Sequence, residues 1–199
     1  MLFRSTVSVT VDDGTDPSNT VTRDITVTAV NDASSLAAIE GVALAYNENA
    51  GPVAITGTVT VSDVDDTNIE SATVQITANY ANGEDVLAFT DTANISGSWD
   101  AASGTMTLTG SDTLANYQAA LRAVTYANTS DDPSILARTV SFTVDDGTDP
   151  SNTVTRDISV TAVNDASSLA AIEGAPLGYT ENAGAVAITG TVKIGRAHV

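Results

Sequence analysis

The chain has 199 residues and a formal net charge of −18, because 25 acidic residues face only seven basic ones. Such a surface repels nucleic acid and anionic membranes and suits a protein whose carboxylates are offset by divalent cations, and no stretch approaches the roughly 20 apolar residues of a membrane span. The absence of cysteine and the single histidine, His198, argue against a disulfide framework, zinc or haem sites and thiol or serine–histidine nucleophiles, so we expect a protein that is not an enzyme, with no nucleic-acid partner and no membrane insertion.

A long segment of the chain recurs 133 residues further on. Residues 6–59 and 139–192 differ at only seven of 54 positions. A fixed period of this kind is typical of tandem arrays. We therefore expect the natural protein to be longer than this chain. Three parts are predicted: the last two strands of a preceding repeat at 6–33, a complete repeat at 34–166, and the first strands of a following repeat at 167–192.

The two ends of the chain match nothing in the other copy of the repeat. GTGCTCTTCCGATCT, with GTG as a start codon, encodes residues 1–5, and ATCGGAAGAGCACACGTC encodes residues 194–199. Both are reads of one common sequencing adapter from opposite strands. We therefore predict that residues 1–5 and 193–199 derive from the adapter, with a hybrid codon at Lys193. The remainder has four arginines and all 25 acidic residues, a net charge of −21.

Thr, Val and Ile alternate with polar residues between clusters of Asp, Asn and Gly, a pattern that predicts an all-β fold. One segment differs, since apolar residues from Leu114 to Leu121 recur at helical spacing behind a cap at Ser111 or Asp112. We therefore predict a β-sandwich of roughly 130 residues with one short inserted helix over 113–122. The predicted strands lie near 36–46, 53–62, 69–78, 84–90, 95–100, 104–110, 123–128, 138–146 and 153–163.

Acidic clusters follow several of these strands. If nine strands run up and down, the loops 62–66 and 144–149 reach the end of the domain where the chain enters at 31–32, and the chain leaves at the opposite end. Carboxylates without basic partners are costly unless a cation lies among them, and Ca²⁺ prefers ~6–8 oxygen ligands. A solvated hairpin turn is the alternative for the 144–149 sequence. The carboxylates predicted to converge are Asp32, Asp63, Asp65 and Asp146.

The order of these motifs resembles the cadherin pattern, and it is most similar to the cadherin-like repeats of large bacterial surface and secreted adhesins. The motifs that carry the resemblance are Asn31-Asp32, Glu48-Asn49-Ala50, Asp63-Val-Asp65, the strand 140–146 with Gly147 and Pro150, and the closing Val160–Asp165. The resemblance implies a cadherin/immunoglobulin-like sandwich with Ca²⁺ at both junctions. The implied ligands are Asn31, Asp32, Asp63, Asp65, Asn68 and Asp146 at the upper junction, where the chain enters, and Glu48, Asn164 and Asp165 at the lower one.

The sequence also departs from the family pattern. Ala29 and Ala162 stand where the linker of that family has its first aspartate, and Ala33 and Ala166 stand where it has its final asparagine. The mid-domain Asp-Arg-Glu motif is missing, and Asp112 is a weak substitute. We therefore expect fewer ions at each junction than in animal cadherins.

Two functions of different classes remain open. One is a calcium-stabilised structural spacer and adhesion repeat of a giant extracellular bacterial adhesin, at the cell surface or in a biofilm, with neighbouring repeats, surface polysaccharide or another adhesin as partners. The other is a calcium-dependent polysaccharide-binding β-sandwich module. A buried Trp99 favours the spacer, whereas an exposed Trp99 beside a carboxylate pair favours the module. The pair Glu84-Asp85 is interpreted as a solvated turn.

The repeat also predicts two incomplete ends. Residues 6–32 bring only the last two strands of a sandwich, and residues 167–192 bring only the first strands. We expect their apolar faces to lack partners within one molecule and to complement each other between molecules.

Overall fold

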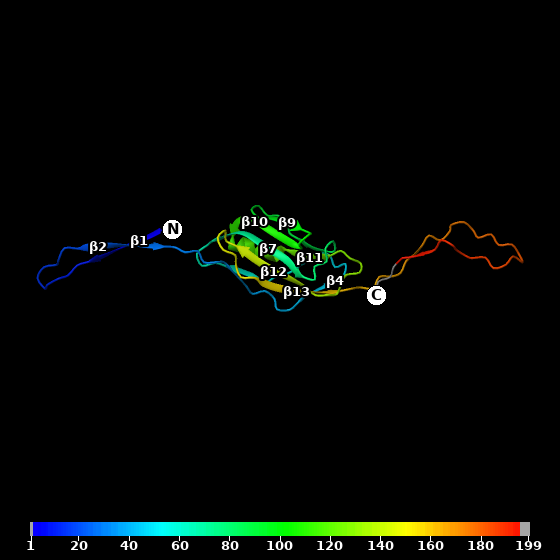
Figure 1. Ribbon diagram of the computed structural model, residues 1–199, viewed down its shortest axis with the longest axis horizontal. Helices are drawn as coiled ribbons and strands as arrows, with labels where there is room; N and C mark the ends of the chain where they lie inside the picture. Colours follow the sequence, from blue (N-terminus) through cyan, green and yellow to red (C-terminus); the bar gives the residue numbers. More distant parts are fainter. Residues whose placement is uncertain (1, 196–199) are drawn as a thin grey trace.

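The computed structural model describes residues 2–195, which form β-strands and one short helix. An N-terminal hairpin, a central sandwich and a C-terminal segment follow one another along one axis (Figure 1). The hairpin consists of β1 (Leu2–Val9) and β2 (Val21–Thr28), and the C-terminal segment carries β14 (Leu169–Ala170) and β15 (Lys193–Ile194). Of the predicted adapter-derived ends, Met1 and residues 196–199 lie outside the described residues.

The central sandwich packs a six-stranded sheet, in the order β4-β13-β12-β7-β10-β9, against the smaller sheets β5-β11-β8 and β3-β6. Tyr46 and Tyr126 meet edge to face across the interior, with ring centroids 5.0 Å apart. A mostly β fold with one short helix is thus confirmed. The elements are β3 (Ser35–Ala37), β4 (Leu44–Asn47), β5 (Val53–Ala54), β6 (Thr60–Ser62), β7 (Asn68–Ala78), β8 (Asp85–Ala88), β9 (Ser96–Asp100), β10 (Thr105–Thr113), α1 (Leu114–Ala123), β11 (Thr125–Asn128), β12 (Arg138–Asp145) and β13 (Val154–Thr161).

The central strands owe their place to alternating residue types. Along β12, Val140, Phe142 and Val144 are buried, and the intervening Thr139, Ser141 and Thr143 are not. Full burial of such an apolar side chain contributes ~1.5–3 kcal/mol to the free energy of unfolding. The neighbouring strand β7 alternates in the same way, so the two strands form the middle of the large sheet.

The helix α1 begins at Leu114, one residue later than predicted, and its cap is not the predicted Ser111 or Asp112. Thr113 is the N-cap, and its hydroxyl accepts the Asn116 N–H at 3.2 Å. Asp112 accepts the Asn116 side-chain amide instead, at 2.8 Å. The predicted core residues of this helix, Tyr117 and Leu121, are buried.

The first two predicted strands are wrong as continuous elements, because each divides in two. Residues 36–46 become β3 and β4, which lie in different sheets, and residues 53–62 become β5 and β6. Between β3 and β4, Ala38 takes a left-handed φ of 57°. The Glu40 carboxylate then accepts the Thr56 hydroxyl at 2.6 Å and the Gly57 N–H at 2.8 Å, which ties the two breaks together.

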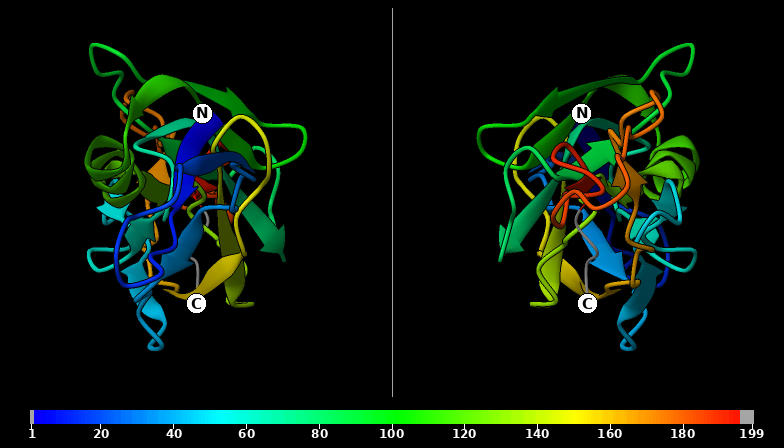
Figure 2. Two further views of the ribbon diagram at one scale, coloured as in Figure 1. Left: turned by 90° about the vertical axis from the view of Figure 1, so that its left-hand side faces the viewer. Right: turned by 90° about the vertical axis from the view of Figure 1, so that its right-hand side faces the viewer.

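The chain enters and leaves the sandwich at opposite ends (Figure 1). Viewed along the long axis, the hairpin and the C-terminal segment both fall within the outline of the sandwich (Figure 2). Within residues 2–195 the only helix is α1, which at ten residues is far too short to cross a bilayer.

Candidate metal centres

An acidic cluster, here called the upper cluster, lies in the loop between β6 and β7. Carboxylate oxygens of Asp63, Asp65 and Asp66 lie within 4.8 Å of one another. Asp63 organises the loop, because its carboxylate accepts the Ser34 hydroxyl at 2.6 Å and the N–H groups of Asp65 at 3.0 Å and Asp66 at 2.8 Å. Asp66 is not among the ligands predicted from the sequence, although the run Asp65-Asp66 signals it.

The incoming chain lies against this cluster. The Asn31 side-chain amide donates to Asp146 at 3.2 Å and to Asp149 at 3.4 Å, and the Asp32 N–H donates to Asp65 at 3.3 Å. Asn31, Asp32, Asp65 and Asp146 are therefore at the same end of the sandwich, where the hairpin joins it.

Asn68, the remaining residue implied at the upper junction, makes a different contact. It begins β7, pairs with Thr113 of β10, and donates its side-chain amide to the Ser111 hydroxyl at 3.3 Å. That hydroxyl in turn donates to Glu70 at 2.7 Å. The Asn68 side-chain amide is thus held beside β10.

The surroundings shift the pKa values of Asp63, Asp65 and the neighbouring Asp146 in different directions. Partial burial opposes ionisation of Asp63, but hydrogen bonds from the Ser34 hydroxyl and two backbone N–H groups lower its pKa to about 2. Loss of solvation beside its neighbours and the nearby Asp63 carboxylate raise the pKa of Asp65. Backbone N–H groups, the Asp149 N–H first, lower the pKa of Asp146, although the charge on Asp63 opposes this. A cation among these oxygens would let all three carboxylates remain ionised.

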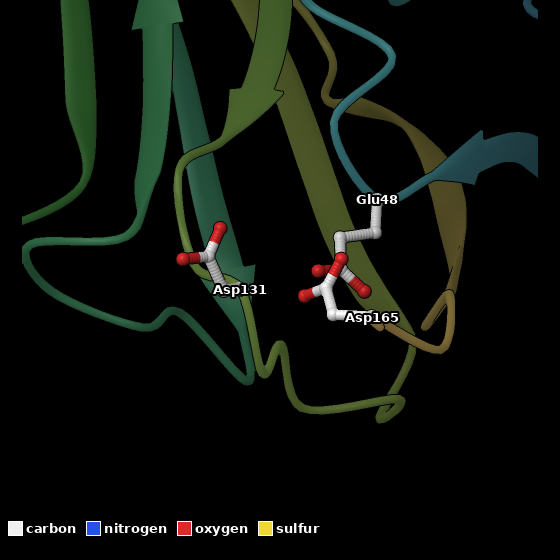
Figure 3. A group of neighbouring side chains, drawn as sticks. All are labelled: Glu48, Asp131 and Asp165. Atoms are coloured by element: carbon white, nitrogen blue, oxygen red, sulfur yellow. The ribbon is translucent and has the colours of Figure 1, made fainter. Parts of the chain in front are cut away.

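A second cluster, here called the lower cluster, lies at the opposite end of the sandwich. Ligand oxygens of Glu48, Asp131 and Asp165 lie within 4.8 Å of one another (Figure 3). Glu48 is only 5% exposed, and its carboxylate accepts the Val163 N–H at 2.7 Å. Figure 3 shows the Glu48 and Asp165 side chains reaching toward each other, with Asp131 arriving from the loop between β11 and β12.

Two further residues lie at the lower junction, Asn164 and Asp131. Asn164 is exposed, and its side-chain amide donates to the backbone carbonyl of Asp165 at 3.4 Å. Asp131 belongs to the lower cluster, although it is not among the ligands implied by the sequence. Its only signal is the Asp131-Asp132 pair in the loop between two predicted strands.

Basic residues do not neutralise either cluster. The ion pairs found within residues 2–195 join Arg4 to Asp24, Arg138 to Asp85 and Arg156 to Glu40. None of these carboxylates belongs to the upper or the lower cluster. Both clusters consist of hard oxygen donors, which are the ligands that Ca²⁺ prefers.

The surroundings of Trp99 bear on the choice between the spacer and the polysaccharide-binding module. Trp99 is half-buried and meets Tyr80 edge to face at 6.2 Å, and neither acidic cluster includes a residue of its strand β9.

The interpretation of Asp85 as part of a solvated turn is wrong. Asp85 is buried, and it accepts the Arg138 Nε–H at 3.1 Å.

No protein-family model matches the chain, and no curated protein matches it.

Proposed function

We propose that the chain is a calcium-stabilised structural repeat of an extracellular bacterial adhesin, a non-enzymatic spacer in a tandem array of cadherin-like sandwiches. The observation that carries this proposal is the position of the two acidic clusters. One lies where the chain enters the sandwich and the other lies where it leaves, so each is placed to act on a junction between neighbouring repeats.

At the upper junction, Asp63 and Asp65 with Asp66 would hold the ion, and Asp146 with Asn31 would border it. The incoming backbone already contacts this group through the Asp32 N–H. When bound, Ca²⁺ supplies charge compensation for carboxylates that otherwise repel one another. The residues then fix the incoming segment against the sandwich, which limits bending between repeats.

The spacer is favoured over a polysaccharide-binding module by the surroundings of Trp99. Its ring lies against Tyr80 and packs on the core. A calcium-dependent sugar site would need a pair of carboxylates beside this ring, and neither acidic cluster includes a residue of its strand β9. The lower cluster supports the spacer independently, because Glu48 binds the backbone of Val163 as the chain leaves the sandwich.

Thermal unfolding in Ca²⁺ and in chelator tests the proposal. A ligand that binds only the folded state stabilises it by RT ln(1 + [L]/Kd), which is ~2.7 kcal/mol at a hundredfold excess over Kd. We expect the central sandwich to melt at a higher temperature in millimolar Ca²⁺. The double variant Asp63→Asn with Asp65→Asn is expected to lose most of that gain.

The matched control is the double variant Asp12→Asn with Asp13→Asn. It removes the same charge from the loop of the N-terminal hairpin. Asp12 and Asp13 are equivalent in sequence to residues 145–146, but this loop lies far from both clusters (Figure 1). This control is expected to keep the full response to Ca²⁺. Identical melting curves in Ca²⁺ and in chelator would contradict the proposal and leave the acidic clusters as solvated loops.

A further inference from the structure

The N-terminal hairpin has the same internal structure as two strands of the central sandwich. In the hairpin Thr6 pairs with Asp24, and in β12–β13 the equivalent Thr139 pairs with Asp157. The turns also agree, since Gly14 and Gly147 each donate a backbone N–H to an aspartate two residues earlier at 2.7 Å. The hairpin thus presents the surface that β12 and β13 present.

The surroundings of these two hairpins differ. In the N-terminal hairpin the apolar side chains are exposed, from 46% at Val7 to 69% at Val11. In the sandwich the equivalent side chains are at most 4% exposed, because the rest of the domain covers them. The exposed set is Val7, Val9, Val11, Ile25 and Val27, and the buried equivalents are Val140, Phe142, Val144, Ile158 and Val160.

The C-terminal segment repeats residues 34–59 in the same way. The Glu173 carboxylate accepts the Thr189 hydroxyl at 2.6 Å and the Gly190 N–H at 2.8 Å, as Glu40 does with Thr56 and Gly57. Its apolar side chains are nevertheless exposed, from 41% to 82%, whereas their equivalents are at most 2% exposed. These pairs are Leu169 and Leu36, Tyr179 and Tyr46, Ile188 and Ile55, and Val192 and Val59.

The central sandwich shows how these two kinds of surface fit together. β13 and β4 pair in parallel, with Ile158 opposite Leu44. Arg156 donates to the carbonyls of Val42 and Ile55 and forms an ion pair with Glu40 at 3.4 Å. Asn152 makes two hydrogen bonds to the backbone of Leu36, at 2.8 and 2.9 Å.

The side chains that make these contacts are present on the exposed segments. Arg23 and Asn19 on the hairpin are equivalent to Arg156 and Asn152, and Glu173 on the C-terminal segment is equivalent to Glu40. The remaining partners are the backbone carbonyls of Val42 and Ile55 and the backbone N–H and carbonyl of Leu36. The equivalent residues Ala175, Ile188 and Leu169 keep these groups, and the one N–H that the substitutions remove, at Pro176, is not among them. Each exposed segment therefore carries its half of a complete contact set.

We propose that residues 6–32 of one copy of this chain bind residues 167–192 of a second copy, with β2 alongside residues 177–180 as β13 lies alongside β4. Arg23 then reaches the carbonyls of Ala175 and Ile188 and the carboxylate of Glu173. The two segments project from opposite ends of one molecule (Figure 1), so they meet only between molecules. The contact is head to tail, and it builds open chains rather than closed dimers.

Both surfaces are ordered before they meet. The hairpin already has the register of β12–β13, and the C-terminal segment already has the hydrogen bonds of residues 38–58. Ordering on association therefore costs little, which favours binding. The rebuilt contact lacks the partner of β12 on its other side, β7, so it is weaker than the sandwich itself.

Sedimentation equilibrium of the 199-residue chain over a range of concentrations tests this proposal. We expect the weight-average mass to rise with concentration. Ile25→Asp and Ile188→Asp each place a charge on one of the two faces, and each variant alone is expected to stay monomeric. Because each variant keeps one intact face, an equimolar mixture of the two is expected to form a heterodimer and to stop there.

The matched controls lie one residue away on the opposite faces. Thr26→Asp and Ala187→Asp change positions whose equivalents, Ser159 and Ala54, are exposed in the sandwich, so both are expected to assemble as the parent chain does. Ile25 and Ile188 are exposed in the single chain, and an unchanged melting temperature of the central sandwich verifies that it still folds. A monomeric parent chain, assembly of either isoleucine variant alone, or a monomeric mixture would overturn the proposal. None of the substituted residues belongs to either acidic cluster, so the outcome is independent of the calcium proposal.

Discussion

Asp85 is the carboxylate most completely enclosed by polar partners. One of its oxygens accepts the Tyr126 hydroxyl at 2.6 Å and the Asn128 amide at 2.7 Å. The other accepts the Arg138 Nε–H at 3.1 Å and the Ala81 N–H at 2.8 Å. Burial and the Asp85 carboxylate raise the pKa of Tyr126, so its hydroxyl remains a donor. This network joins β8, β11 and β12 inside the sandwich.

Removing the buried charge should destabilise the sandwich strongly. Asp85→Ala leaves the Arg138 guanidinium buried without its partner, a change that costs ~3–5 kcal/mol in comparable sites. Chemical denaturation measures the loss in the free energy of unfolding. The control Asp157→Ala removes an exposed carboxylate that accepts only the Thr139 hydroxyl, and we expect it to cost less than about 1 kcal/mol. Equal losses for the two variants would show that the network contributes nothing beyond a surface contact.

At the scale of elements, the sequence predicts best where one face of a strand or helix is buried throughout. β7, β12 and β13 alternate regularly, and α1 repeats its apolar residues at helical spacing, so their predicted ranges agree with the structure within a few residues. The division of 36–46 and 53–62 could not be predicted in this way. It depends on hydrogen bonds that the Glu40 carboxylate accepts from residues 16 and 17 positions away, and these leave no periodic trace in the sequence.

The stability that the Glu40 carboxylate contributes to the sandwich should depend on pH. Partial burial alone would raise its pKa, but hydrogen bonds from Thr56 and Gly57 lower it from 4.5 to about 2. A carboxylate with a lowered pKa contributes stability that is complete above its unfolded value and is lost as the pH falls toward the folded one. Glu40→Gln should therefore be less stable than the parent chain at pH 6, and the difference should narrow between pH 4.5 and about 2.

Urea unfolding of both proteins across this pH range measures that difference. The control is Glu173→Gln, which alters the same local hydrogen bonds on the exposed C-terminal segment, where the pKa of Glu173 is also lowered to about 2. Since that segment does not contribute to the core of the sandwich, the control should unfold as the parent chain does at every pH. If the free energies of unfolding of Glu40→Gln and the parent chain differed by the same amount at every pH, the Glu40 carboxylate would not have a lowered pKa.

At the scale of the whole molecule, strand parity predicts from the sequence that most of the acidic residues at the upper junction lie together. Asp63, Asp65 and Asp146 lie in loops that return to the same end, and the incoming Asn31 and Asp32 contact them. Asp131 could not be predicted, because nothing in the sequence fixes the path of the loop between β11 and β12. The splitting of two strands did not disturb the parity, since each divided strand still runs from one end of the sandwich to the other.

If bound calcium fixes the upper junction, it should restrict the hairpin relative to the sandwich. The chain contains no cysteine, so spin labels can be attached at Thr22→Cys and Thr155→Cys, both exposed positions. Double electron–electron resonance then reports the spread of distances between β2 and β13, with Ile188→Asp included to prevent head-to-tail association. We expect a narrower distribution in Ca²⁺ than in chelator, because the ion joins the loop carboxylates that contact Asn31 and Asp32. Adding Asp63→Asn and Asp65→Asn should leave the distribution broad in both conditions, whereas Asp12→Asn with Asp13→Asn should preserve the narrowing. Distributions of equal width with and without Ca²⁺ in the parent chain would show that the upper cluster does not stiffen the junction, even if the ion binds there.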